Sequence, residues 1–295
     1  MTERIGLDGH PGGRPTTAVG FIGLGDQGAP MARAVGESDH DLHVWARRPE
    51  SLAAIEGTPY TVAGTVAELA ARVDVLLLCL RDDSDIADLL DHRQLLDGLR
   101  PGTVVVNHGT GDPTENVAFG ERFAARGVAY LDAPVSGGGP GARARTLTTF
   151  VGGDRAVYDR CAPIFDTFSR LVVHMGPVGT GQLTKLLNNS MTMSNLKNAA
   201  DMLRIAEKLD VDVPALITAL SVSSGASFML GALNTEITPD LAPHLQTLMR
   251  KDIEHFADAV RARGVDPSEL RDRGLAGADS LVEAVAIVAG RADGS

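Results

Sequence analysis

Short runs of aliphatic and β-branched residues alternate with amphipathic stretches over about the first 175 residues of the chain. Several runs are apolar throughout, which is typical of strands covered on both faces. The runs predict strands at Ala18–Gly23, Leu42–Ala46, Val73–Leu80, Thr103–Asn107, Val128–Leu131, Leu147–Val151 and Leu171–Met175. Helices are predicted at Gly28–Gly36, Glu50–Glu56, Glu115–Arg126 and Ala156–Phe165. This alternation predicts an α/β fold with a mostly parallel, doubly wound sheet.

The pattern changes after Met175, beyond which only helical stretches are predicted. A Gly-Pro-x-Gly-x-Gly turn over 176–181 leads into a long helical stretch from Gln182 to about Leu209. At about 1.5 Å per residue this helix would be roughly 40 Å long, enough to link two domains. We therefore predict a flexible tail over 1–16, a doubly wound domain over 17–177 and an all-α domain over 178–295.

Composition narrows the class of protein. The formal net charge of −11 argues against a nucleic-acid or anionic-membrane partner. No apolar run approaches the roughly 18 residues that span a bilayer, and the first residues lack the apolar core of a signal peptide. Cys79 and Cys161 are too few for a disulfide framework, and no Cys/His cluster has zinc spacing. We expect a cytoplasmic protein that acts on a small molecule and holds no metal.

The first predicted strand runs directly into a glycine-rich segment that opens the first helix. The segment comprises Gly23, Leu24, Gly25, Asp26, Gln27 and Gly28. Such a GxGxxG segment between strand and helix favours dinucleotide binding over a merely structural turn. Gly23 would make the tight turn, Gly25 would let the backbone approach a pyrophosphate, and Gly28 would allow close helix packing. The helix amino end supplies free N–H groups for the phosphate.

The end of the second predicted strand bears on the choice of cofactor. An NAD site usually has an acid there, which holds the ribose 2′-hydroxyl. This chain has Arg47 and Arg48 instead, whose guanidinium groups suit the 2′-phosphate of NADP. Glu50 is a weaker candidate for a ribose contact, and a solvated arginine pair is the structural alternative. We predict NADP(H), with NAD(H) less favoured.

A second constellation follows the strand that ends near Leu131. The segment Asp132-Ala133-Pro134 leads into Ser136, Gly137 and Gly138, and such a turn exposes a hydroxyl and several backbone N–H groups. That arrangement can cradle a carboxylate, although an ordinary glycine-rich loop would look similar.

A third constellation lies at the start of the long helix. Lys185 and Asn189 are four residues apart and therefore share one helix face. A buried lysine with a lowered pKa can transfer a proton near neutral pH, and a neighbouring amide can orient it or bind substrate. A lone lysine is usually solvated, so this hypothesis depends on the other two constellations.

Together these residues resemble the β-hydroxyacid dehydrogenase family, which includes 3-hydroxyisobutyrate dehydrogenase and tartronate semialdehyde reductase. The resemblance covers about residues 17 to 260, through GFIGLGDQGAPMA, DAPVSGG, GTGQLTKLLNN and the late Lys251-Asp252 pair. It implies a Rossmann domain, a long interdomain helix, a helical C-terminal domain and a dimer or tetramer.

The resemblance also implies roles for individual residues. Lys185 would be the general acid/base, and Asn189 would bind the substrate. Lys251 would lie beside the nicotinamide, and Arg47 matches an arginine of NADP-using members. Ser136, Gly137 and Gly138 would hold the substrate carboxylate. Leu80 and Thr110 are further candidates for cofactor binding.

Some positions depart from the family pattern. Asn107-His108-Gly109-Thr110 replaces Asp-x-Ser-Thr, so one cofactor-side hydroxyl is missing. Arg145 replaces a glycine, and with Arg143 it could favour a second anionic group on the substrate, although surface exposure is the stronger alternative. Phe228 falls where family members often place an aromatic residue against the substrate, and core packing is the alternative.

The resulting hypothesis is reversible oxidation of a short β-hydroxy acid to its semialdehyde. Imine reduction on the same fold is an alternative, but imine reductases generally have Asp or Tyr at the position of Lys185. A non-catalytic NADP(H)-binding sensor is a second alternative, which the loss of the hydroxyl at Gly109 favours and the retained Lys185 opposes.

Overall fold

The computed structural model describes residues 17–290, so the predicted tail at 1–16 lies outside the described residues. Within them the chain forms two compact units. The first unit contains residues 17–109 and 116–178, and the second contains residues 110–115 and 179–290. The short segment 110–115 therefore belongs with the helical part of the chain, although it lies between two strands of the first unit.

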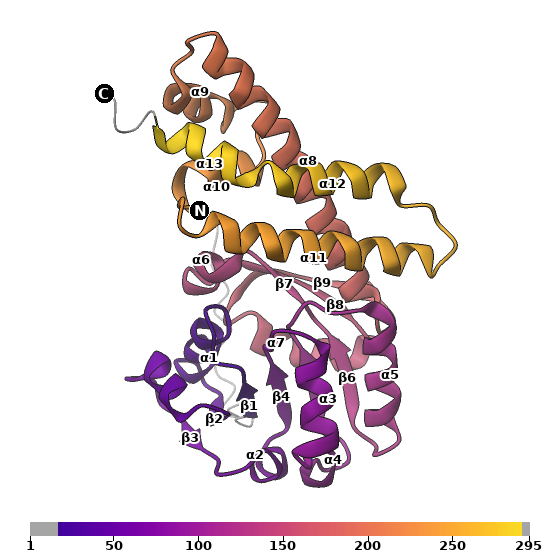
Figure 1. The fold of residues 1–295 in the computed structure, drawn as a ribbon. Helices are drawn as coiled ribbons and strands as arrows, with labels where there is room; N and C mark the ends of the chain where they lie inside the picture. Colours follow the sequence, from indigo (N-terminus) through magenta and orange to yellow (C-terminus); the bar gives the residue numbers. More distant parts are fainter. Residues whose placement is uncertain (1–16, 291–295) are drawn as a thin grey trace, which may run out of the picture. The chain divides into compact units, whose positions relative to one another are not determined.

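The first unit is built around a single sheet (Figure 1). The strand order is β3-β2-β1-β4-β5-β6-β8-β7, and β9 pairs with β8. Strands β1 to β6 are parallel, whereas β8 is antiparallel to β6 and β7. The bounds are β1 Ala18–Ile22, β2 Asp41–Trp45, β3 Thr61–Val62, β4 Val75–Leu78, β5 Val104–Asn107, β6 Ala129–Asp132, β7 Val135–Ser136, β8 Leu147–Gly152 and β9 Ser169–Gly176.

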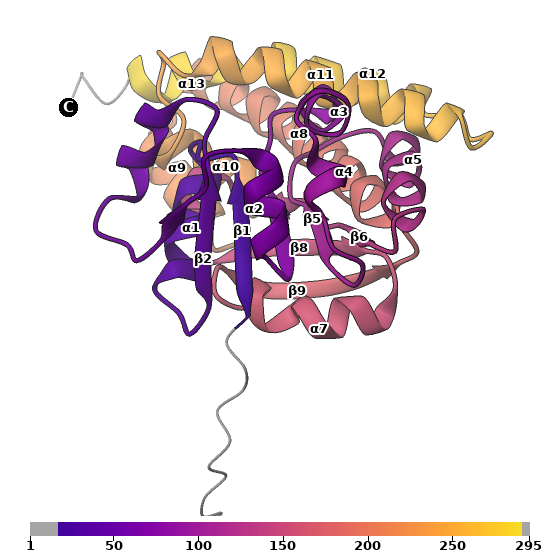
Figure 2. The ribbon, with the colours of Figure 1, turned by 90° about the horizontal axis from the view of Figure 1, so that it is seen from below.

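Helices cover both faces of this sheet (Figure 2). Successive side chains of β4 point to opposite faces, so Val75 and Leu77 join one buried cluster while Leu76 and Leu78 join the other. The helical segments are α1 Gly28–Gly36, the 3₁₀ helix η1 Pro49–Ile55, α2 Val66–Arg72, α3 Asp83–His92, α4 Leu95–Gly98, α5 Pro113–Ala124, α6 Gly138–Arg143 and α7 Arg155–Phe165.

Among its described residues the second unit contains helices joined by loops and no strand, and it is built on α8 (Figure 1). Helix α8 packs against α10, α11, α12 and α13. A Cβ at Gly277 of α12 would collide with the main-chain oxygen of Met193, so the absence of a side chain lets the two helices approach closely. The bounds are α8 Thr180–Lys208, α9 Val213–Leu220, α10 Phe228–Thr235, α11 Ala242–Arg261, α12 Ser268–Asp279 and α13 Leu281–Gly290.

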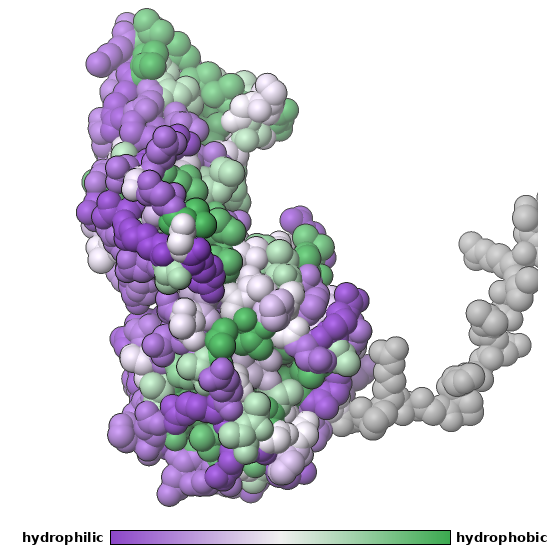
Figure 3. All heavy atoms as spheres, turned by 90° about the vertical axis from the view of Figure 1, so that its right-hand side faces the viewer, coloured by the Kyte–Doolittle hydropathy of each residue, from purple (hydrophilic) through white to green (hydrophobic). Residues whose placement is uncertain are grey.

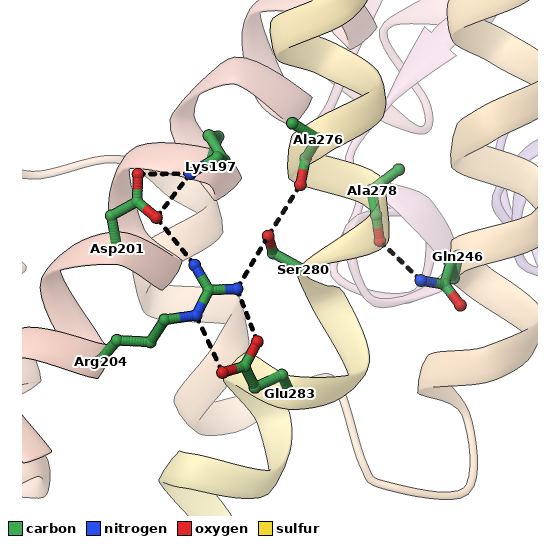
Figure 4. Close-up of polar contacts among 8 residues, drawn as sticks. All are labelled: Lys197, Asp201, Arg204, Gln246, Ala276, Ala278, Ser280 and Glu283. Carbon is green, nitrogen blue, oxygen red and sulfur yellow. Dashed lines mark hydrogen bonds and ion pairs between the residues drawn. The ribbon is translucent and has the colours of Figure 1, made fainter.

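A polar network ties α8 to α13 within this unit (Figure 4). Arg204 donates to both carboxylate oxygens of Glu283, at 2.9 and 2.6 Å, and to Asp201 at 2.8 Å. Lys197 binds the same Asp201. Because these side chains are partly exposed, we expect the network to fix the helix register more than to add stability.

The predicted α/β fold with a parallel sheet, long helix and helical C-terminal part is confirmed. All seven predicted strands are present, each within two residues of the predicted bounds. The predicted helix at Glu50–Glu56 is a 3₁₀ helix that begins at Pro49, because the preceding Arg48 remains extended. Helices α2, α3, α4 and α6 and the short β3 and β7 were not predicted.

The face drawn in Figure 3 combines hydrophilic side chains with smaller groups of apolar ones. No helix in the described part of the chain has the length and apolarity needed to cross a membrane.

Candidate active site

The glycine-rich segment forms the turn between β1 and α1. Gly23 has a φ of 105°, and a Cβ there would collide with the main-chain oxygen of Cys79. A Cβ on Gly28 would collide with the main-chain oxygen of Gly23, so α1 can pack closely only without that side chain. A Cβ on Gly25 would meet nothing within 4 Å. Gly23 therefore allows the tight turn, Gly28 allows the close packing of α1, and Gly25 leaves its main chain accessible. These are the features that bind a dinucleotide pyrophosphate.

Arg47 and Arg48 follow β2 and are both exposed. Arg47 Nη1 lies 3.2 Å from Asp85 Oδ1 on α3, whose side chain is only 12% exposed. Arg81, which follows β4, places Nη2 3.8 Å from the other oxygen of Asp85. Sequence reasoning missed Asp85 and Arg81, since no local motif marks them. Leu80 is partly buried against the helices of this face.

Arg143 and Arg145 lie beside the glycine-rich segment. Arg143 Nη1 is 2.7 Å from Asp26 Oδ1, and Arg145 forms an ion pair with Glu37, which directly follows α1. Both arginine side chains are about half exposed, which favours the surface alternative. With Gly25 and the outer face of α1 they line a hollow of about 690 Å³. Arg145 has a positive φ of 56°, where family members have glycine.

The Ser-Gly-Gly segment links β7 to α6. Ser136 is the last residue of β7, and Gly138 is the first residue of α6. Gly137 and Gly138 have φ values of 130° and 61°, which favour glycine. All three residues are partly exposed. The segment therefore presents main-chain groups and one hydroxyl at the surface of the first unit.

Asn107, which stands where the family pattern has aspartate, is part of a hydrogen-bond network after β5. Asn107 Oδ1 accepts from the Gly109 N–H at 2.9 Å, and its amide donates to Asn116 Oδ1 at 2.9 Å. Tyr130 donates to the same Asn116 oxygen at 2.7 Å. These contacts hold the backbone after β5 in the absence of the family's hydroxyl.

In the second unit, Lys185 and Asn189 lie one turn apart on α8, close to Asp252 of α11. Asn189 Nδ2 donates to Asp252 Oδ2 at 2.8 Å. Burial lowers the pKa of Lys185, while the charge of Asp252 opposes that shift. Burial also raises the pKa of Asp252, against the opposing effect of Lys185. In the sequence Asp252 is marked only by the Lys251-Asp252 motif, and its contact with Asn189 was not predicted.

The remaining second-unit candidates are more exposed. Lys251 is exposed on α11. Thr110 is partly exposed and precedes Gly111, whose N–H donates to Gln182 Oε1 at 2.9 Å. Phe228 begins α10 with 63% of its surface exposed, so the core-packing alternative for it is wrong.

The doubly wound sheet and its glycine turn define a Rossmann-type dinucleotide-binding protein with a helical second unit. The family model for the NAD binding domain of 6-phosphogluconate dehydrogenase matches residues 18–176. The model described as NAD-binding of NADP-dependent 3-hydroxyisobutyrate dehydrogenase matches residues 179–285.

Comparisons of whole chains agree with these domain matches. An uncharacterized oxidoreductase of Mycobacterium tuberculosis is 31% identical over 82% of this chain and 82% of its own length. An NAD-dependent L-serine dehydrogenase of Pseudomonas aeruginosa is 31% identical over 73% of each chain. A solved structure of Mycobacterium tuberculosis 3-hydroxyisobutyrate dehydrogenase with L-serine has a TM-score of 0.76 at 24% identity, covering 93% of this chain and 99% of that one.

The chain belongs to the β-hydroxyacid dehydrogenase family of NAD(P)-dependent oxidoreductases, as its motifs predicted.

Proposed function

We propose that the protein is an NADP(H)-dependent dehydrogenase that interconverts a short β-hydroxy acid and its semialdehyde, with Lys185 as general acid/base. The observation that supports this most directly is the Lys185, Asn189 and Asp252 cluster on α8 and α11. A lysine whose pKa is lowered by burial gives up its proton more readily than a solvated lysine, so it is better suited to accept a proton from a substrate.

The residues of the glycine turn fit a bound dinucleotide. Gly25 leaves room for the pyrophosphate, and it lies just before the amino end of α1, where the first main-chain N–H groups of a helix can bind phosphate. When bound, a nicotinamide dinucleotide supplies the redox chemistry of hydride transfer. Arg47 and Arg48 support NADP(H) as the preferred form, because exposed guanidinium groups can bind a ribose 2′-phosphate.

The substrate would be held through its carboxylate. Ser136, Gly137 and Gly138 offer a hydroxyl and main-chain donors for that group. Asn189 is already oriented by Asp252, so its amide is positioned before substrate arrives. A relative described as an L-serine dehydrogenase supports a small hydroxy acid as the substrate class.

Lys185 would take the proton of the substrate hydroxyl during oxidation and return it during reduction. As the alkoxide character of the substrate oxygen develops, the lysine ammonium provides the positive charge that stabilises it. Asp252 keeps a negative charge beside this lysine and so limits how far its pKa falls. Lys251 and Thr110 would complete the cofactor contacts, and Phe228 would pack against the substrate.

The test is the initial rate of NADP⁺ and NAD⁺ reduction with a panel of short β-hydroxy acids. Lys185→Ala is expected to lower kcat by about 10² to 10⁴-fold while NADPH binding is kept. Lys208→Ala, at the exposed end of the same helix, is the matched control and should retain full activity. Full activity in Lys185→Ala would refute the assigned role. No turnover of any acid, with NADPH binding intact, would favour imine reduction or a sensor instead.

A further inference from the structure

One carboxylate on α3 is approached by two arginines from different strand ends. Asp85 Oδ1 lies 3.2 Å from Arg47 Nη1, and Asp85 Oδ2 lies 3.8 Å from Arg81 Nη2. The side chain of Asp85 is 12% exposed, whereas those of Arg47 and Arg81 are 56% and 74% exposed. The acid is therefore covered, and both guanidinium groups remain accessible to a ligand.

The sheet topology brings these two arginines to the nucleotide-binding edge. Arg47 lies two residues after the end of β2, and Arg81 lies three residues after the end of β4. Strand β1 lies between β2 and β4 and leads into the glycine turn. The carboxyl ends of parallel strands at this point are where a doubly wound sheet binds its nucleotide.

We propose that Arg81 is a second guanidinium that, together with Arg47, binds the 2′-phosphate of NADP(H). This inference rests on the proposed function, of which it specifies the cofactor site. The shared Asp85 shows that both guanidinium groups can reach a single anion at once. A phosphomonoester has three non-bridging oxygens and up to two negative charges, so it can accept from both groups more strongly than one carboxylate does.

The local charges are consistent with this role. Arg81 also contacts Asp82 Oδ2 at 3.1 Å through Nε. This contact does not use the Nη groups, one of which lies 3.8 Å from Asp85. These exposed ion pairs contribute little to folding. A phosphate can therefore replace the carboxylate contact of Arg81 at a small energetic cost.

The experiment measures the affinities of 2′,5′-ADP and 5′-AMP by calorimetry, because these fragments differ only in the 2′-phosphate. We expect the wild-type protein to bind 2′,5′-ADP at least about tenfold more tightly. Arg81→Ala should weaken 2′,5′-ADP binding about tenfold and change 5′-AMP binding less than about twofold. Arg47→Ala should behave in the same way.

Arg72→Ala is the matched control, because it removes an exposed arginine paired with Glu68 elsewhere in the same unit. It should change neither affinity by more than about twofold. Asp85→Asn removes the competing anion and should tighten 2′,5′-ADP binding severalfold.

The outcomes separate this inference from the proposed function. If wild-type protein prefers 2′,5′-ADP but Arg81→Ala keeps that full preference, the role of Arg81 is wrong and NADP(H) preference survives. If the wild type binds both fragments equally, the NADP(H) preference fails, and the role of Arg81 fails with it. If Arg72→Ala weakens 2′,5′-ADP binding as much as Arg81→Ala does, the loss comes from removing a positive charge from the protein in general, and a specific role of Arg81 is refuted.

Discussion

His108 is a buried histidine whose protonation the fold opposes. Its side chain is 2% exposed and lies edge-on to Phe165 and Phe168, with ring centroids 5.5 and 5.4 Å away. Nδ1 must donate to the main-chain oxygen of Ala133 at 2.8 Å, because a carbonyl can only accept. Nε2 has no hydrogen-bond partner among the described residues. Burial lowers the pKa of His108 from 6.5 to about 4.

This shift makes the stability of the first unit depend on pH. The folded protein binds fewer protons at His108 than the unfolded chain does, so its contribution is fully present above pH 6.5 and is lost as the pH falls toward about 4. The shift from 6.5 to about 4 is worth roughly 3 kcal/mol at about 1.4 kcal/mol per pH unit. Between pH 7.5 and pH 5.0 the expected loss is about 2 kcal/mol.

The assay is urea unfolding followed by the fluorescence of Trp45, the single tryptophan, which lies on β2 in the first unit. His108→Gln keeps an amide donor for Ala133 and removes the titration. The free energy of unfolding of wild type minus variant should fall by about 2 kcal/mol between pH 7.5 and pH 5.0. Val151→Ala, a change at a buried residue of β8 with no ionisable group, is the control that should destabilise the unit and keep the wild-type acid loss. A difference between wild type and His108→Gln that stays constant with pH would refute the reasoning.

Three further changes test the site and the second unit. Asp252→Asn removes the charge that raises the pKa of Lys185, so the acidic limb of the kcat/KM profile for oxidation should move to lower pH. Gly277→Ala places a Cβ against a main-chain oxygen of α8 and should lower the free energy of unfolding by about 1–3 kcal/mol. Gly231→Ala has open space around the added methyl group and should not destabilise the protein. Thermal unfolding compares the two variants. Gly25→Ala should fold normally but weaken NADPH binding measured by calorimetry, because the added methyl group lies where the pyrophosphate approaches.

The fold was predictable where apolar residues form continuous runs. Strands such as β4 and β5 are buried on both faces, so their sequences, VLLL and VVVN, are almost entirely apolar and are recognisable as strands. Helix α3 was missed because its sequence, Asp83–His92, is rich in aspartate and has few apolar positions. Its buried residues are Ile86, Leu89 and Leu90, which form a narrow stripe. The two-residue β3 and β7 are too short to show any periodicity.

The candidate site was predictable only in part, because motifs mark individual residues and do not mark which distant residue each of them pairs with. Arg47 and Asp85 are 38 positions apart, Asn189 and Asp252 are 63 apart, and Arg143 and Asp26 are 117 apart. Pairs at such separations are set by the fold, so a single sequence gives no signal for them.

These acids change what the predicted residues can do. Asp252 is largely withdrawn from solvent and acts on the pKa of Lys185, so it adjusts proton transfer and cannot simply be displaced by a ligand. The pair of Arg47 and Asp85 differs, because its guanidinium is 56% exposed while its carboxylate is 12% exposed. An incoming phosphate can therefore bind the arginine from the solvent side without moving the acid. A carboxylate thus acts electrostatically on the proposed base, whereas at the proposed cofactor site a carboxylate forms an ion pair with an arginine that stays accessible to a ligand.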